Sequence, residues 1–133
     1  MSNPISSYLG FQADALPLRE QRLKLIASNL ANADTPGYKA RDIDFNAAMQ
    51  AATQARQASS SPEPPARPDH LPLAGGIQDF HVARVAAQPS LDGNTVDPDA
   101  ERAAYGRAAL EYRASLNFLE SKVRTLLTAI TGQ

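Results

Sequence analysis

Apolar residues recur with helical spacing at both ends of the chain and lose this spacing in between. From Tyr105 onward, alternating steps of four and three residues connect apolar or aromatic positions without a break. Such a row is typical of a long helix that packs along another helix as a coiled coil. The row consists of Tyr105, Ala109, Tyr112, Leu116, Leu119, Val123, Leu126 and Ile130.

The residues on either side of this row mark the ends of the predicted helix. Asp97 suits a helix N-cap, Pro98 suits the first helical position, and Gly132 is typical of a helix C-terminus. We therefore predict that a helix runs from 98 to 131.

A second row with the same spacing runs from residue 5 to residue 33. Pro17 lies in its middle, and a proline inside a helix removes a backbone hydrogen bond at a cost of about 3 kcal/mol. We expect either a kink near residues 13–17 or a new helix that begins there with Asp14 as its N-cap. The row contains Ile5, Leu9, Gln12, Leu16, Arg19, Leu23, Ile26, Leu30 and Ala33.

The two matching rows predict that the terminal helices pack against each other. Apolar residues off the rows are expected to contact other chains, because a helix with two apolar rows touches more than one neighbour. These off-row residues are Leu18 and Leu25 at the N-terminal end, and Leu110, Phe118 and Leu127 at the C-terminal end. The predicted helix-packing residues are Leu16, Leu23, Ile26, Leu30, Tyr105, Tyr112, Leu116, Leu119, Val123, Leu126 and Ile130.

A dense group of turn-forming residues follows the first helical row. In the sequence from Thr35 to Tyr38, a proline followed by a glycine has the residue types that a type II turn requires. Asn32 comes directly after the row, and asparagine tolerates the left-handed conformation that often closes a helix. We call residues 28–41 the corner, and its candidate functional residues are Asn29, Asn32, Thr35, Pro36, Gly37 and Tyr38.

The middle of the chain is irregular. A short extended segment after Tyr38 is expected to lead into a short helix capped by Asp44 or Asn46, and residues 80–85 could form a strand that pairs with that segment. Prolines crowd residues 59–72, which we expect to be a linker. The prediction is one mainly α-helical domain, with an N-terminal helix in 1–33, an irregular excursion in 34–96 and a C-terminal helix in 97–133.

Composition argues against most kinds of chemistry. The chain has 133 residues, no cysteine and a net charge of −1, which gives no electrostatic case for binding nucleic acid or an anionic membrane. His70 and His81 lack the companions that a metal site needs. We predict no enzyme activity, no cofactor and no small-molecule substrate. The first residues also lack the features of a cleaved secretory signal.

The corner carries a resemblance to a known family. Its run Ala-Ser-Asn-Leu-Ala-Asn, followed by Thr-Pro-Gly-Tyr, resembles the N-terminal signature of the bacterial flagellar rod and hook proteins. The continuation Lys-Ala-Arg-Asp-Ile-Asp-Phe and the block at residues 91–101 resemble the members that form the proximal rod. The family pattern has an unbroken N-terminal helix, and Pro17 departs from it.

The resemblance implies a structural subunit of the flagellar basal body. Such a subunit would leave the cell through the flagellar type III export gate without cleavage and would stack helically to transmit motor torque. Its implied partners are copies of itself, rod subunits such as FlgC, and the adaptor FliE with the export gate and MS ring. Phe11 and its neighbours resemble an export-gate recognition element.

A second hypothesis remains open from the residues alone. A soluble helical adaptor or chaperone could use the same coiled coil to bind a single partner. Cell fractionation separates the two, because an adaptor stays in the cytosol and a rod subunit co-purifies with detergent-extracted basal bodies.

Overall fold

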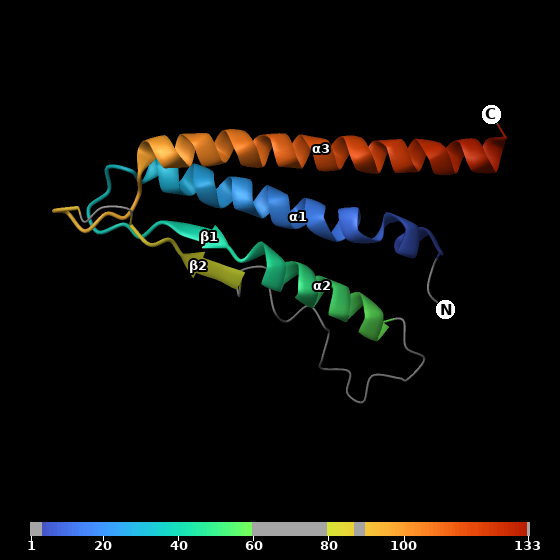
Figure 1. Cartoon of the computed structure of the whole chain (residues 1–133), viewed down its shortest axis with the longest axis horizontal. Helices are drawn as coiled ribbons and strands as arrows, with labels where there is room; N and C mark the ends of the chain where they lie inside the picture. The colour runs from blue at the N-terminus through green and yellow to red at the C-terminus, as the bar shows by residue number, and fades with distance from the viewer. Residues whose placement is uncertain (1–3, 60–79, 87–89, 133) are drawn as a thin grey trace.

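The chain folds into a long pair of helices with a small two-stranded sheet and a short helix along one side (Figure 1). The computed structural model describes residues 4–59, 80–86 and 90–132, with the backbone alone for residues 4–8 and 58–59. Its helices are α1 (Pro4–Ala31), α2 (Phe45–Ser59) and α3 (Pro98–Thr131), and its strands are β1 (Arg41–Ile43) and β2 (His81–Ala83). The predicted mainly α-helical fold with paired terminal helices is confirmed.

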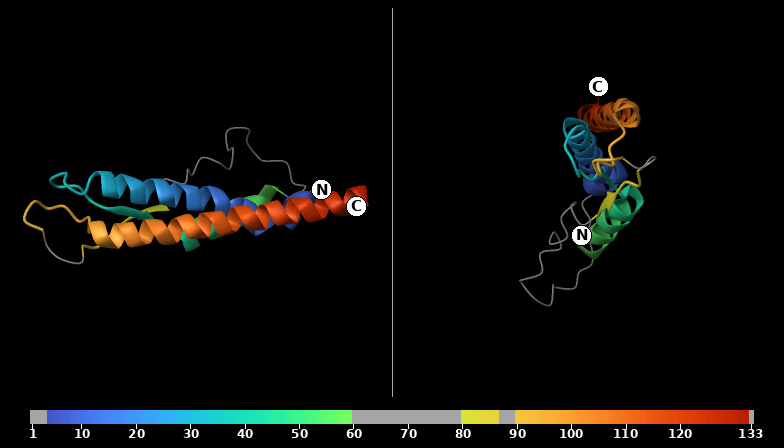
Figure 2. Two further views of the ribbon diagram at one scale, coloured as in Figure 1. Left: turned by 90° about the horizontal axis from the view of Figure 1, so that it is seen from above. Right: turned by 90° about the vertical axis from the view of Figure 1, so that its left-hand side faces the viewer.

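Helix α1 is the middle layer of the molecule. It lies along α3 on one side and contacts β1 and α2 on the other (Figure 2). The two chain ends lie at the same end of the helix pair, and the corner lies at the opposite end. The two long helices therefore run antiparallel, and the chain reverses its direction at the corner.

The ends of α3 have the predicted caps. The carboxylate of Asp97 accepts hydrogen bonds from the backbone N–H groups of Asp99 and Ala100, both at 3.1 Å, and Pro98 opens the helix. Gly132 closes it with a φ of 72° and donates its N–H to the carbonyl of Thr128 at 2.8 Å. Both ends therefore satisfy backbone groups that a helix leaves unpaired.

The break in α1 lies at Gly10 and not at residues 13–17 as predicted. Gly10 has non-helical dihedral angles, φ 12° and ψ −104°, whereas Pro17 lies within the helix. A Cβ at Gly10 would lie 2.8 Å from Nη1 of Arg56, so the absent side chain leaves room for this guanidinium. Pro17 and Ala13 are both exposed, which lets water reach the Ala13 carbonyl that lost its helical partner.

The hydrophobic core is small and lies between α1, β1 and α2. Ala15 and Leu18 of α1 are buried against Ile43, Ala48 and Met49, with Leu25, Phe45 and Phe80 partly buried around them. Leu18 and Leu25 were expected to contact other chains, and this expectation is wrong. They pack against the excursion of their own chain, because β1 and α2 fold back over that face of α1.

The predicted pairing of the two short strands and the predicted start of α2 are confirmed. Strand β1 pairs antiparallel with β2, with Asp42 opposite Val82. Asp44 caps α2, since its carboxylate accepts the N–H of Ala47 at 3.0 Å. Of the predicted linker at 59–72, Ser59 ends α2 and the rest lies outside the described residues, as does His70. No helix in the described ranges is both long and apolar enough to span a membrane.

The small core gives a prediction for the docking of α2. Met49→Ala should remove buried contacts worth about 2–5 kcal/mol and so release α2 from α1. Trypsin cleavage after Arg56 should then accelerate at least tenfold, since about 1.4 kcal/mol corresponds to a factor of ten. The matched control is Gln50→Ala, which changes the exposed neighbour. Equal cleavage rates in the two variants would show that Met49 does not hold α2.

Candidate functional site: the corner and the faces of the terminal helices

The predicted type II turn forms at the corner. Tyr38 donates its N–H to the carbonyl of Thr35 at 3.2 Å, and Gly37 has a φ of 73°. Positive φ at the third residue of the turn is the reason that glycine is required there. Pro36 and Gly37 are exposed, while the ring of Tyr38 is half-buried, so the turn projects from the end of the helix pair.

Helix α1 ends through the side chain of Asn32 and not through a left-handed residue. Within the described residues, only glycines have positive φ, so the predicted backbone role of Asn32 is wrong. Its amide donates to the carbonyl of Ser28 at 2.8 Å, and its side-chain oxygen accepts from the hydroxyl of Thr35 at 3.2 Å. The side chain thereby joins the last helical turn to the start of the type II turn.

Asn29 attaches the outgoing chain to α1. It is fully buried, and its side chain pairs with the backbone of Arg41 in both directions: Nδ2 donates to the carbonyl at 2.8 Å, and Oδ1 accepts the N–H at 3.0 Å. The hydroxyl of Tyr38 lies 3.4 Å from the same Oδ1. An asparagine here imitates the backbone of a neighbouring strand and fixes where β1 begins.

Asn94 is a functional candidate that sequence reasoning missed. Its side chain is buried, and its amide lies 2.8–3.0 Å from the carbonyls of Asn32, Ala33 and Thr35. Its side-chain oxygen accepts the N–H of Val96 at 2.8 Å. The sequence showed only a turn at residues 91–94, because nothing local indicates that one residue of this turn binds the backbone just after a helix some sixty positions away.

Further hydrogen bonds join the corner to the segment before α3. Gly37 donates its N–H to the carbonyl of Asp92 at 2.8 Å, and Thr95 donates its N–H to the carbonyl of Tyr38 at 3.0 Å. Lys39 reaches the carbonyl of Gly93 at 2.7 Å, which uses its ammonium group in a structural contact. The corner is therefore a two-segment unit, and its second segment leads directly into α3.

A chain of ion pairs extends from the corner to the first turn of α3. Asp42 of β1 accepts hydrogen bonds from Arg22 of α1 at 3.1 and 3.2 Å and from Arg84 at 2.9 Å. Arg84 also pairs with the buried carboxylate of Glu101 at 2.7 Å. All three layers of the molecule thus share one polar cluster, and removing one member would leave a poorly solvated charge.

The pKa of Asp42 reflects this setting. Burial is the largest single influence and acts to raise the pKa, but hydrogen bonds from Arg22, Arg84 and the N–H of Ile43 together outweigh it. The pKa of the carboxyl is therefore lowered from its ordinary value. The folded chain holds Asp42 ionised more strongly than the unfolded chain does.

Arg19 joins the same three layers further along α1. Its guanidinium donates to the hydroxyl of Ser115 and, at 3.2 Å, to the carbonyl of Glu111, both on α3. It also lies 5.7 Å from the ring centroid of Phe45, in cation–π contact. A polar residue in the predicted apolar row thus becomes a link across α1.

The face of α3 that packs on α1 is only partly the predicted one. Its buried residues are Glu101, Ala108 and Ser115, which are polar or small. Tyr112, Leu119 and Leu126 of the predicted row are half-buried beside them. In α1 the expected packing is closer to the prediction, with Ile26 fully buried and Leu16, Leu23 and Leu30 half-buried.

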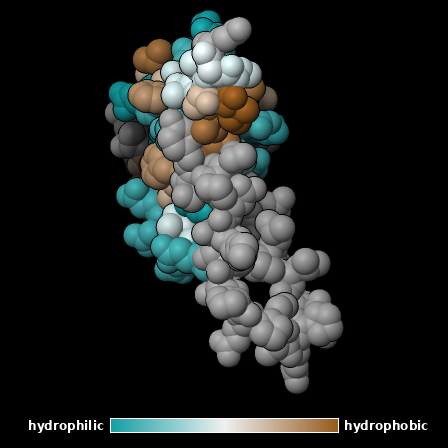
Figure 3. Space-filling view, turned by 90° about the vertical axis from the view of Figure 1, so that its right-hand side faces the viewer, coloured by the Kyte–Doolittle hydropathy of each residue, from teal (hydrophilic) through white to brown (hydrophobic). Residues whose placement is uncertain are grey.

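The remaining large members of the row are exposed in the single chain. Tyr105, Leu116 and Val123 are 38–43% exposed and Ile130 is 77% exposed, so their predicted packing on α1 is not observed. Leu110, Phe118 and Leu127 are also exposed, and their expected contact with other chains stays a prediction. Apolar side chains are visible at the end of the molecule where the chain termini lie (Figure 3).

Phe11 lies on the surface, apart from the corner. It is 55% exposed and borders a shallow hollow formed with residues of α2, among them Met49 and Thr53. Among the described residues, no group of histidines and carboxylates could hold a metal ion. His81 lies in β2 without such companions.

Comparison with known proteins assigns the chain to a family. Residues 9–39, which include most of the corner, match the family model described as "Flagella basal body rod protein". The flagellar basal body rod protein FlgB of Escherichia coli is 37% identical over 135 residues, covering 98% of this chain and 97% of that protein. The chain belongs to the FlgB family of flagellar basal body rod proteins.

Other FlgB proteins agree along the full length. The one from Salmonella typhimurium is 38% identical and covers 99% of both chains, and the one from Cereibacter sphaeroides is 41% identical and covers 94% of both. FlgB proteins are structural, so this chain is a subunit of the proximal rod in the flagellar basal body and not an enzyme. The family also implies assembly with other rod subunits.

The contacts of Asn94 lead to a prediction about the corner. Asn94→Ala should lower the free energy of unfolding by about 1–3 kcal/mol, because carbonyls at the end of α1 lose their buried donor. Urea unfolding followed by circular dichroism measures this change. Asn46→Ala, at an exposed position of α2, is the matched control and should change stability by less than about 0.5 kcal/mol. A loss in the control as large as in Asn94→Ala would contradict the assigned role.

The lowered pKa of Asp42 predicts how stability depends on acid. Because the folded pKa lies below the unfolded value of about 3.9, the stabilisation is present above that value and is lost as pH falls through the folded pKa. Asp42→Asn should therefore weaken the acid dependence of the urea midpoint below about pH 4 and lower stability at neutral pH.

The control for this experiment is Asp99→Asn. Asp99 is almost fully exposed and pairs with Arg102 on the surface, where an ion pair contributes little. An Asp42→Asn variant with the acid dependence of the parent chain would show that the ion-pair cluster does not stabilise the fold.

Proposed function

We propose that the chain is exported without cleavage by the flagellar type III system and then stacks helically at the base of the rod, where it transmits motor torque. The observation that carries this proposal is the exposed apolar row on α3. Four large side chains of the row face away from the chain's own core, although the row runs for most of a long helix. Burying them against neighbouring subunits would supply the contact that a single chain lacks.

The proposed assembly surface is the row already predicted from the sequence. Its outward members would contact other subunits, and its half-buried members would hold α1 and α3 together within each subunit. The packing residues on α1 support this contact between α1 and α3 within each subunit. The three layers of the fold support a tube of such helix pairs with the excursion at 34–96 on its outside. The helical segments within 1–33 and 97–133 would form the inner part.

The proposed partners are other copies of the chain and the next rod subunits, such as FlgC. At the base of the rod we propose contacts with the adaptor FliE, the export gate and the MS ring, on the periplasmic side of the inner membrane. Exposed Phe11, close to the N-terminus, supports a role in recognition by the export gate. These partners come from the family resemblance, and the exposed row indicates only that partners are needed.

The corner has a proposed role of its own. The turn and its hydrogen bonds connect the end of α1 to β1. The residues involved are Asn29, Asn32, Thr35, Pro36, Gly37 and Tyr38. Because the same unit is joined to the segment before α3, it fixes the direction in which the excursion leaves the helix pair. We infer that the family signature preserves this geometry so that each subunit presents the same outer surface.

A charge placed in the exposed row tests the proposal. Val123→Asp should abolish swimming, because a carboxylate buried between subunits without a partner is strongly unfavourable. Val123 is already exposed in the single chain, so the variant should fold and be exported normally. Detergent-extracted basal bodies from the variant strain should lack the rod subunit.

The matched control is Ser121→Asp, which adds the same charge to an exposed position on a different face of α3. This variant should swim and assemble like the parent strain. Normal swimming of the Val123→Asp strain would contradict the proposed assembly surface.

A further inference from the structure

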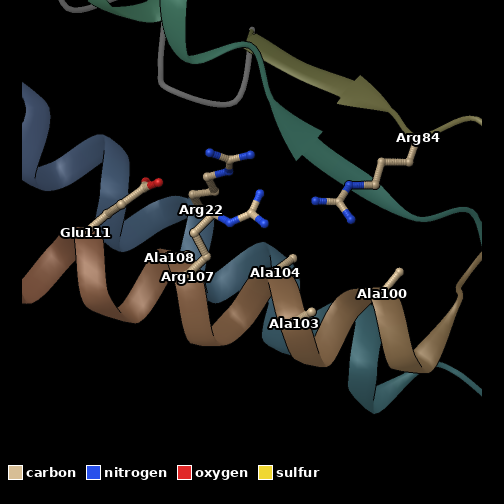
Figure 4. A pocket seen from close by; sticks show the side chains of 8 residues that line it. All are labelled: Arg22, Arg84, Ala100, Ala103, Ala104, Arg107, Ala108 and Glu111. Carbon is tan, nitrogen blue, oxygen red and sulfur yellow. The ribbon is translucent and has the colours of Figure 1, made fainter.

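A cavity lined by arginines lies beside the contact between α1 and α3. Its volume is about 240 Å³. Figure 4 shows that Arg22 of α1, Arg84 from the segment after β2 and Arg107 of α3 direct their guanidinium groups toward a common space. The α3 wall is built from four alanines, whose short side chains leave the space open. Glu111 is the one carboxylate among the lining residues.

Two of the three arginines are held in place by the half-buried Asp42 and the buried Glu101. Arg22 uses Nε and Nη2 to bind Asp42, which leaves the hydrogens on Nη1 available. Arg84 uses both terminal nitrogens on Asp42 and Glu101, which leaves Nε–H. Both groups are therefore fixed before any ligand arrives, so binding would not have to order them.

Arg107 differs from the other two. It is exposed, and within the described part of the chain it has no hydrogen bond or ion pair. A planar guanidinium beside two fixed ones is suited to a carboxylate, which accepts two parallel N–H bonds. Asp42 and Glu101 offset the charges of Arg22 and Arg84, so Arg107 and Glu111 are the charged lining groups without an ion pair in the described part of the chain.

The same flank of α3 carries a second feature of protein interfaces. Phe118 lies eleven residues after Arg107, which at 3.6 residues per turn places it on nearly the same side of the helix. It is 60% exposed. Arginine and aromatic residues are enriched among the side chains that dominate binding energy at interfaces. This flank is separate from the exposed row of Tyr105, Leu116, Val123 and Ile130.

We propose that the arginine cavity binds a carboxylate side chain of a neighbouring rod subunit. This inference rests on the proposed function, because stacking of subunits would cover α3. Covering Arg107 without a counter-charge would be unfavourable, and an incoming aspartate or glutamate supplies one. The contact would set the rotational position of adjacent subunits, while the apolar row supplies most of the buried area.

The test uses charge reversal at Arg107 in a strain that carries the variant in place of the parent gene. Arg107→Glu should abolish swimming and prevent recovery of the subunit in basal bodies, while the purified variant keeps the circular dichroism spectrum of the parent chain. Arg113→Glu is the matched control, because Arg113 is an exposed arginine on another side of α3. The control strain should swim normally.

Selection for swimming revertants of the Arg107→Glu strain identifies the partner. The proposal expects second-site changes that convert an aspartate or glutamate of a rod subunit into lysine or arginine. Normal swimming of the Arg107→Glu strain, or revertants that only restore residue 107, would overturn it.

Two further measurements distinguish a subunit carboxylate from a free anion and from a failure of assembly as a whole. A free anion as the ligand would give a different pair of results. Sulfate or citrate would raise the melting temperature of the parent chain more than chloride does at equal ionic strength, and the Arg107→Glu strain would swim normally. These two results together would overturn the proposal. Absence of the parent chain from basal bodies would overturn the proposed function and this inference with it. Presence of the parent chain together with normal swimming of the Arg107→Glu strain would overturn this inference alone.

Discussion

The amide of Asn94 is the contact on which the arrangement of the two terminal helices depends. It binds carbonyls at the end of α1 while its own backbone lies three residues before the N-cap of α3. These carbonyls belong to the residues that follow α1, since the helix ends at Ala31, and the amide holds them beside the segment that leads into α3. The end of one helix is thereby fixed to the start of the other. Asn29 makes the corresponding contact on the other side of α1, where it fixes the start of β1.

Polar contacts have this importance because the apolar core is small. The buried cluster consists of a few residues between α1, β1 and α2, and the α3 face against α1 is polar or small where it is most buried. Specific hydrogen bonds and the cluster of Arg22, Asp42, Arg84 and Glu101 therefore determine how the layers are placed. The large apolar side chains of α3 remain on the surface, which suits a subunit that is completed by its neighbours.

Much of this fold could be predicted from the sequence, because local signals specify it. The caps of α3, the type II turn and the cap of α2 each follow from residue types at fixed spacing. The two short strands were also indicated by their residue types, although α2 lies between them in the sequence. The predictions failed where a distant group decides the outcome. The kink lies at Gly10, where the guanidinium of Arg56 from α2 occupies the space that a side chain would take. The row on α3 is rotated partly away from α1, and the most buried positions of that helix are Glu101, Ala108 and Ser115. Asn94 was missed for the same reason, since its partners are separated from it by most of the excursion.

Hydrogen exchange of the isolated chain, measured residue by residue by nuclear magnetic resonance, tests the account most directly. If the corner holds the helix pair together, the amides of Gly37, Ala40, Arg41 and Thr95 should be among the slowest to exchange, because each donates to the corner network. Amides in the last turns of α3 should exchange fastest within that helix, since its apolar residues there are exposed. Corner amides that exchange as fast as the end of α3 would contradict the account.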